Sequence, residues 1–215
     1  MAIVVPEGSY PHPRSGPLRA FFGRAVLALF GWRVEVTLPA GPKGIIVVYP
    51  HTSNWDFPVG YLAKLAIRLP LRWAGKDSLF VGPFAPVFRW MGGIPVNRRE
   101  HTGFIGQLSR EFSERPWMWL ALAPEGTRKR TDHLKSGFWH LALAANVPVG
   151  LAYIDWEEKV VGLSRYVQLT GDEAHDLATL REAWAGKHGR RRGLESDIRF
   201  KASQEANGVT RQPEA

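Results

Sequence analysis

Cysteine is absent from the 215-residue chain, which excludes disulfide bonds and metal sites built from thiolates. Long apolar runs are absent too, because no stretch reaches the roughly 18 residues that a membrane-spanning helix needs. Residues 1–8 lack both the basic start and the long apolar core of a signal peptide. The chain also has no internal repeat and no low-complexity tract, and its length is typical of one globular domain.

Acidic residues are fewer than basic ones, 20 against 28, and the formal net charge is +8. The chain also carries nine Trp and eleven Phe. This combination suits a surface that meets something anionic and partly apolar, such as a membrane face or a phosphorylated amphiphile. We therefore expect a cytoplasmic protein that associates peripherally with the inner face of the membrane. Nucleic acid is not an expected partner, because the basic run 190–192 lies in a polar segment without a recognisable reader fold.

The chain divides into three parts by composition. Residues 1–16 are rich in Pro and Gly and predict an irregular lead-in. Residues 17–186 form the expected domain, beginning with an amphipathic helix over 17–31 whose apolar residues recur at helical spacing. That apolar stripe favours packing against the domain, and the alternative is a helix lying in the membrane interface. Residues 187–215 predict a basic, flexible tail, and 187–201 alone carry half of the net charge, with six Lys/Arg against two Asp/Glu.

Strand-like and helix-like segments alternate through the domain. We expect strands over 33–38, 44–49, 72–75, 94–96, 117–123, 147–156 and 166–169, and helices over 56–67, 102–112, 137–145 and 173–185. The segment 80–93 is dense in Pro, Gly and aromatic residues and predicts turns. This alternation predicts an α/β fold, a single domain with a mostly parallel central sheet flanked by helices.

A histidine and a carboxylate stand five positions apart directly after the apolar run 44–48. His51 is a candidate general base, and Asp56 could fix its tautomer. The two side chains can meet only if His51 lies in a loop and the helix begins near Asp56, as Pro58 in its first turn favours. The alternative is structural, because Ser53 and Asp56 also fit a capping box at a helix start.

Two further segments offer groups that grip anions. Residues 125–128, Glu-Gly-Thr-Arg, follow the buried strand 117–123 with a flexible glycine, a hydroxyl and a guanidinium fork. Residues 92–99 place Arg98 at the end of a short strand, where it can reach over the same sheet edge as His51. Each segment alone is also compatible with a solvated polar loop.

In order and spacing, His51-x4-Asp56, residues 93–98, residues 125–128 and residues 147–149 resemble the four motif blocks of the glycerolipid acyltransferases. Enzymes of this family acylate lysophosphatidic acid or glycerol 3-phosphate. The resemblance covers about residues 44–155, and the sequence around His51 is similar to that of a short branch of the family. It implies a glycerolipid-acyltransferase-like α/β fold.

The resemblance also implies a mechanism and a set of site residues. His51 would take the proton of an acceptor hydroxyl as it attacks the thioester of acyl-CoA or acyl carrier protein, with Asp56 orienting the imidazole. No metal, no other cofactor and no covalent acyl-enzyme would be needed. The implied acceptor or phosphate-binding residues are Arg98, Glu125, Gly126, Thr127 and Arg128, and the implied acyl-region residues are Val147 and Pro148.

Other interpretations of the same residues stay open. The expected acceptor is a lysophospholipid such as 1-acylglycerol 3-phosphate, and a different lysolipid, for example lyso-ornithine lipid, is an alternative. A catalytically silent basic protein that binds membranes or nucleic acid is the alternative from another class.

Overall fold

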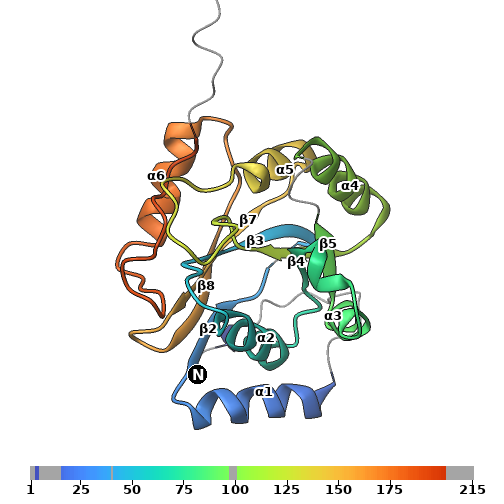
Figure 1. Ribbon diagram of the computed structural model, residues 1–215, viewed down its shortest axis with the longest axis vertical. Coiled ribbons are helices and arrows are strands. Elements are labelled where there is room, and N and C mark those ends of the chain that lie inside the picture. The colour runs from blue at the N-terminus through green and yellow to red at the C-terminus, as the bar shows by residue number, and fades with distance from the viewer. Residues whose placement is uncertain (1–2, 5–15, 40, 97–100, 202–215) are drawn as a thin grey trace, which may run out of the picture.

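The computed structural model describes residues 3–4, 16–39, 41–96 and 101–201, and Arg98 therefore lies outside the described residues. Within this part of the chain, helices surround one central sheet (Figure 1). The strands are β1 (Ile3–Val4), β2 (Arg33–Thr37), β3 (Lys43–Tyr49), β4 (Arg72–Lys76), β5 (Gly93–Val96), β6 (Met118–Leu122), β7 (Val149–Asp155) and β8 (Val160–Val167). The helices are α1 (Pro17–Leu29), α2 (Asp56–Ile67), the 3-10 helix η1 (Asp77–Phe80), α3 (Ala85–Trp90), α4 (His101–Glu114), α5 (Gly137–Ala145) and α6 (Glu173–Ala183).

The sheet has the strand order β1-β2-β8-β7-β3-β6-β4-β5. The strands from β7 to β5 run parallel to one another. The hairpin partner β8 is antiparallel to β7, and β2 and β1 then pair in parallel beyond it. The predicted α/β fold with a mostly parallel central sheet is therefore confirmed. Because the parallel strands share one direction, their carboxyl ends meet at one edge of the sheet.

Each face of the sheet is covered by its own core. The side chains of β3 alternate between the two, as the period of a strand requires. Ile45 and Val47 belong to the core under α4, α5 and α6, whereas Ile46 belongs to the core under α1 and α2. Figure 1 shows the same layers, with α1 and α2 below the sheet and α4, α5 and α6 above it. A strand buried on both faces explains why 44–48 is a continuous apolar run.

Helix α1 packs on α2 with the face opposite to the one that its apolar stripe predicts. Ala20, Gly23 and Leu27 are buried against the domain, and the Arg24 Nε–H donates to the Ala66 carbonyl at 3.1 Å. A Cβ at Gly23 would lie 2.7 Å from the Leu62 carbonyl oxygen, so only a residue without a side chain allows this close approach. The bulky stripe points outward instead. Its exposed members are Leu18, Phe21, Phe22, Leu29 and Phe30.

No described helix is both long enough and apolar enough to cross a bilayer.

The stretch predicted to begin a flexible tail is packed as far as the structure describes it. Leu134 pairs with Phe200 in an isolated parallel bridge, and the Phe200 ring is buried against Phe138. Upstream, residues 187–196 run along the carboxyl edge of the sheet, and we call them the strap. The prediction of a tail from residue 187 is wrong for 187–201 because backbone hydrogen bonds and the burial of Phe200 fix this segment. Residues 202–215 lie outside the described residues.

Three smaller differences concern element boundaries. The segment 80–93, predicted as turns, contains the helix α3, and β8 begins at Val160 rather than near residue 166. The predicted irregular lead-in contributes the short strand β1 to the sheet edge. Helices α2 and α5 begin and end at the predicted residues.

Candidate active site

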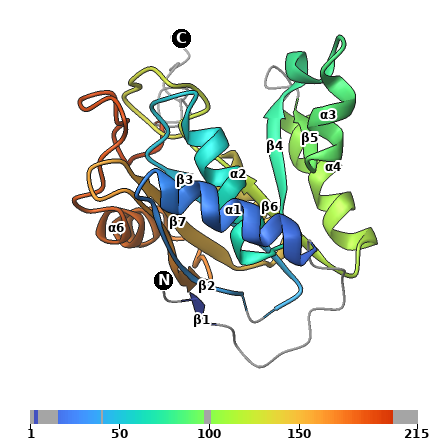
Figure 2. The same ribbon diagram turned by 90° about the horizontal axis from the view of Figure 1, so that it is seen from below.

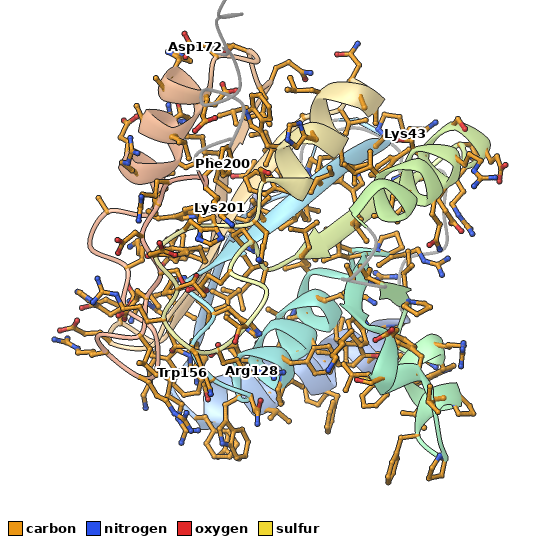
Figure 3. The ribbon with its side chains drawn as sticks, turned by 45° about the horizontal axis from the view of Figure 1, so that its top comes forward. Lys43, Arg128, Trp156, Asp172, Phe200 and Lys201 are labelled. Atoms are coloured by element: carbon orange, nitrogen blue, oxygen red, sulfur yellow. The ribbon has the colours of Figure 1, made fainter. Side chains whose placement is uncertain are left out.

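Three loops that follow parallel strands meet at the carboxyl edge of the sheet. His51 follows β3, Glu125 follows β6 and Trp156 follows β7. Ligands bind in α/β proteins at this edge, because there the strands end in loops that can carry chemistry. Figure 3 labels Trp156 at the end of the molecule where α2 begins.

His51 and Asp56 form the central pair of the site. The Nδ1 atom of His51 lies 3.1 Å from Oδ2 of Asp56, and the two side chains are 20% and 1% exposed. The pair meets as expected for a histidine in a loop and a helix that begins at Asp56. At this distance the carboxylate can accept the Nδ1 proton, which leaves Nε2 as the basic nitrogen. A histidine held in this way can act chemically as an oriented general base.

Asp56 also makes one hydrogen bond of the capping box that the alternative interpretation predicts, although it is the first residue of α2 and Trp55 is the N-cap. The Ser53 N–H donates to Asp56 Oδ2 at 2.8 Å, as in one half of a capping box. The indole N–H of Trp156 donates to Asp56 Oδ1 at 2.7 Å. Both carboxylate oxygens therefore have donors inside the protein, and the orientation of Asp56 is fixed from two sides. The structural contacts of Asp56 are therefore compatible with its predicted role beside His51, which stays a prediction.

Glu125 holds the His51 loop from the other side. Its carboxyl group is buried and accepts the backbone N–H of His51 and, at 3.1 Å, the backbone N–H of Ser196. Burial raises the pKa of Glu125 above its usual range, and the hydrogen bonds from Ser196 and His51 oppose that rise. The Glu125 carboxylate thus holds the backbone of two neighbouring segments, and its contact with the acceptor stays a prediction.

The strap closes over this loop. The Arg191 N–H donates to Thr52 Oγ1 at 3.1 Å, and the Trp156 N–H donates to the His188 carbonyl at 2.9 Å. The Tyr49 hydroxyl donates to the Ser196 carbonyl at 2.9 Å. The functional surroundings of His51 therefore include Trp156 and the strap, which the sequence analysis did not identify. The local sequence around Trp156 and in the strap predicts only turns and charged, solvated side chains.

Comparison with known proteins fits this geometry. A model of the acyltransferase family matches residues 33–152, more than half of the chain. The chain belongs to the acyltransferase family. Its fold is similar to the crystal structure of the 1-acyl-sn-glycerophosphate (LPA) acyltransferase PlsC from Thermotoga maritima, with a TM-score of 0.50 and 17% identity over 77% of this chain and 75% of that chain. A search of curated proteins finds no match.

The acyltransferase match contains His51, Asp56 and Glu125 but ends within β7. Trp156 and the strap lie beyond it. The parts of the site that hold Asp56 and Glu125 from the carboxyl-terminal side therefore come from a segment that the family model does not include.

The other residues of the Glu-Gly-Thr-Arg segment form a turn beside Glu125. Gly126 has a positive φ of 65°, a conformation that glycine adopts without strain. Thr127 Oγ1 accepts the backbone N–H of Lys129 at 3.3 Å. Arg128 is exposed, and none of its neighbours in the described part of the chain forms an ion pair with it. Its guanidinium is thus available to an external anion.

Val147 and Pro148 lie at the opposite edge of the sheet from His51. The Pro148 carbonyl accepts the N–H of Ile45 at 3.0 Å, and Ile45 precedes the carboxyl end of β3 by four residues. Val147 is part of the core under α5. The structure does not bring these two residues to the catalytic pair, and packing accounts for their apolar character. Their contact with an acyl chain stays a prediction.

Within the described ranges, no group of three or more His, Asp or Glu side chains is arranged to hold a metal ion.

Proposed function

We propose that this acyltransferase moves a fatty acyl group from a thioester donor, acyl-CoA or acyl carrier protein, to a hydroxyl of a lysophospholipid-type acceptor such as 1-acylglycerol 3-phosphate. The observation that carries the proposal is the 3.1 Å approach of His51 to a buried Asp56 at the carboxyl edge of a family domain. The Thermotoga protein of similar fold is named as an acyltransferase acting on 1-acyl-sn-glycerophosphate, which supports this acceptor class.

In the proposed reaction, His51 Nε2 takes the proton of the acceptor hydroxyl while the oxygen attacks the thioester carbonyl carbon. Asp56 stabilises the imidazolium that forms. The tetrahedral adduct then expels the thiolate, which recovers the proton from His51. An ester bond replaces the thioester bond, and no acyl-enzyme is formed. Because a thioester is already activated, this scheme requires no metal and no cofactor apart from the donor itself.

The acceptor phosphate has a candidate partner at the mouth of the site. Arg128 presents an exposed guanidinium, and a planar fork of N–H donors matches a phosphate. The turn at Gly126 and Thr127 offers backbone and hydroxyl groups next to it. Arg98 stays a predicted further contact.

The surface formed by α1 and α3 suits a membrane. Its large exposed apolar side chains are Leu18, Phe21, Phe22, Leu29, Phe30, Val81, Phe84, Val87 and Trp90. The Arg19 guanidinium lies 5.0 Å from the Trp90 ring centroid, so the two helices form one surface. Helix α1 contains Arg19 and Arg24 and no acidic residue, which complements anionic lipid headgroups. Figure 2 shows α1 lying across the molecule in front of α2.

This surface is connected to the catalytic edge. The 3-10 helix η1 follows the carboxyl end of β4, and α3 is the next helix, with residues 81–84 between the two. The carboxyl end of β4 belongs to the same sheet edge as His51. We propose that the protein associates peripherally with the membrane through this surface, which would bring His51 close to lysolipids in the bilayer.

The direct test is mass spectrometry of the products formed when the protein meets a mixed lysolipid panel with acyl-CoA or acyl carrier protein thioester. The proposal expects a diacylated phospholipid that carries the donor chain, and the same reaction with His51→Ala gives none. A product from lyso-ornithine lipid alone would move the acceptor to another class. No product from any lysolipid with either donor would refute the function.

A further inference from the structure

One cation of the strap is held between two aromatic rings beside the catalytic pair. The Arg190 guanidinium lies 5.4 Å from the ring centroid of Trp55 and 5.1 Å from that of Trp156. Guanidinium groups stack on indole faces through cation–π attraction while their N–H groups stay free along the edge of the plane. The two rings therefore orient Arg190 without using its hydrogen-bond donors.

The backbone of the strap is fixed around Arg190. The Glu195 carboxylate accepts the N–H groups of Gly189 at 3.0 Å and Gly193 at 2.7 Å, which closes the turn. A Cβ at Gly189 would lie 2.4 Å from Thr52 Oγ1, so the strap touches the residue that follows His51. Arg190 thus stands on a rigid turn pressed against the catalytic loop.

The aromatic partners of Arg190 belong to the catalytic site. Trp156 donates its indole N–H to Asp56, and Trp55 precedes Asp56 in the chain and is 56% exposed. The guanidinium between these rings therefore faces solvent at the mouth of the site. Arg190 therefore lies beside one ring that contacts Asp56 and one that directly precedes it in the chain.

Two other cations of the strap are already paired, whereas Arg191, like Arg190, has no ion-pair partner among the described residues. Arg192 forms an ion pair with Glu157, and Lys187 Nζ lies 3.6 Å from a carboxylate oxygen of Asp155. Arg190, by contrast, has no carboxylate at ion-pair distance among the residues that the structure describes. Its exposed donors are complementary to an anion that the protein itself does not supply.

We infer that Arg190 binds a phosphate group of one of the two substrates, at a site formed by the strap, Trp55 and Trp156. This inference rests on the proposed function. The matching chemistry is a phosphate monoester, which occurs both in the headgroup of 1-acylglycerol 3-phosphate and at the 3′ position of CoA. The strap and Trp156 lie beyond the segment that the family model matches, whereas Trp55 lies within it, so the cation of this anion site comes from the carboxyl-terminal part of the chain.

Steady-state kinetics of Arg190→Ala, Arg190→Lys and the matched control Arg192→Ala test the inference. The control removes the same charge from the same turn, but its guanidinium is directed at Glu157. Loss of a charge-assisted bond predicts that Arg190→Ala raises one KM by about tenfold to a hundredfold, with kcat within a few-fold of wild type. Arg190→Lys keeps most of this defect, because an ammonium lacks the planar fork.

Phosphate-free analogues identify the source of the phosphate. If the acceptor supplies it, the KM for 1-acylglycerol 3-phosphate rises, and monoacylglycerol is used equally by wild type and variant. If the donor supplies it, the KM for acyl-CoA rises, and the thioester of 3′-dephospho-CoA shows no difference. Unchanged KM values for both substrates, an equal rise with a phosphate-free analogue, or the same rise in Arg192→Ala would overturn the inference.

A wild-type protein without transfer activity would refute the proposed function alone. In that case the role of Arg190 is tested by calorimetry, which compares the affinities of wild type and Arg190→Ala for CoA and for monomeric lysophosphatidate. Tenfold or greater weakening of either ligand supports the phosphate site, and equal affinities for both overturn it.

Discussion

Replacing Glu125 with glutamine should slow catalysis by releasing the His51 loop. The buried carboxyl group accepts two backbone N–H groups, one from His51 and one from Ser196. Glutamine keeps an oxygen for one of them and turns its NH₂ group toward the other. The change therefore replaces one charge-assisted bond, worth roughly 1.5–3 kcal/mol, with an unsatisfied buried donor.

The burial of the carboxyl group reduces the net loss. Because burial raises the pKa of Glu125, its charged form is held at a cost that a neutral amide does not carry. We therefore expect the variant to lose about 1–3 kcal/mol of local stability. If this loss falls on the His51 loop, kcat drops by about tenfold to a hundredfold.

The kinetic parameters separate positioning from acceptor binding. A positioning role predicts that Glu125→Gln lowers kcat and leaves the acceptor KM near the wild-type value. Asp176→Asn is the matched control, because this buried carboxylate on α6 also accepts two backbone N–H groups, from Thr170 and Gly171. It should reduce stability in urea denaturation without reducing kcat. A raised acceptor KM with unchanged kcat in Glu125→Gln would refute the positioning role and restore the predicted acceptor contact.

Three further changes have defined outcomes. Trp156→Phe removes the N–H donor to Asp56 and should lower kcat by about tenfold. The variant should still be folded at the assay temperature, as its thermal unfolding midpoint will show. Burial, with a smaller repulsion from a nearby arginine, lowers the pKa of Lys64 to about 8, so the unfolded chain binds more protons above this pH. The free energy of unfolding should then rise from about pH 8 to 10, by at most about 3 kcal/mol, and in Lys64→Met urea titrations this rise should vanish. Phe21→Ser with Phe22→Ser should weaken sedimentation with anionic vesicles by tenfold or more, and undiminished binding would exclude α1 from the membrane contact.

Local sequence patterns were sufficient for the central elements. The apolar run of β3 and the start of α2 at Asp56 follow from hydrophobicity and from Pro58, and together they place His51 next to Asp56. The strand order did not follow from them, because pairing between β3, β6 and β7 is decided by contacts far apart in the chain. The hairpin of β7 and β8 shows the same limit, since β8 was predicted to begin too late.

The predicted orientation of α1 was wrong for a different reason. Periodicity shows that Phe21 and Phe22 share a face with other apolar residues, but it does not show which face the protein buries. Close packing against α2 requires small residues, and Ala20 and Gly23 provide them on the other side.

The strap was missed because its order is set by distant partners. Glycine and arginine in 187–196 are typical of a solvated tail, yet Thr52, Glu125 and Trp156 bind its backbone. Nothing in the local sequence indicates these three contacts. The same contacts place Arg190 at the site, which is why the phosphate inference requires the structure.

The most direct test of the account is kcat of His51→Ala for transfer from acyl-CoA to 1-acylglycerol 3-phosphate, with Asp56→Asn measured beside it. If His51 is the general base and Asp56 orients it, both variants keep the circular dichroism spectrum of the wild type and lose activity, His51→Ala by about a thousandfold or more. Wild-type rates in both folded variants would contradict the proposal that His51 is the general base and that Asp56 orients it.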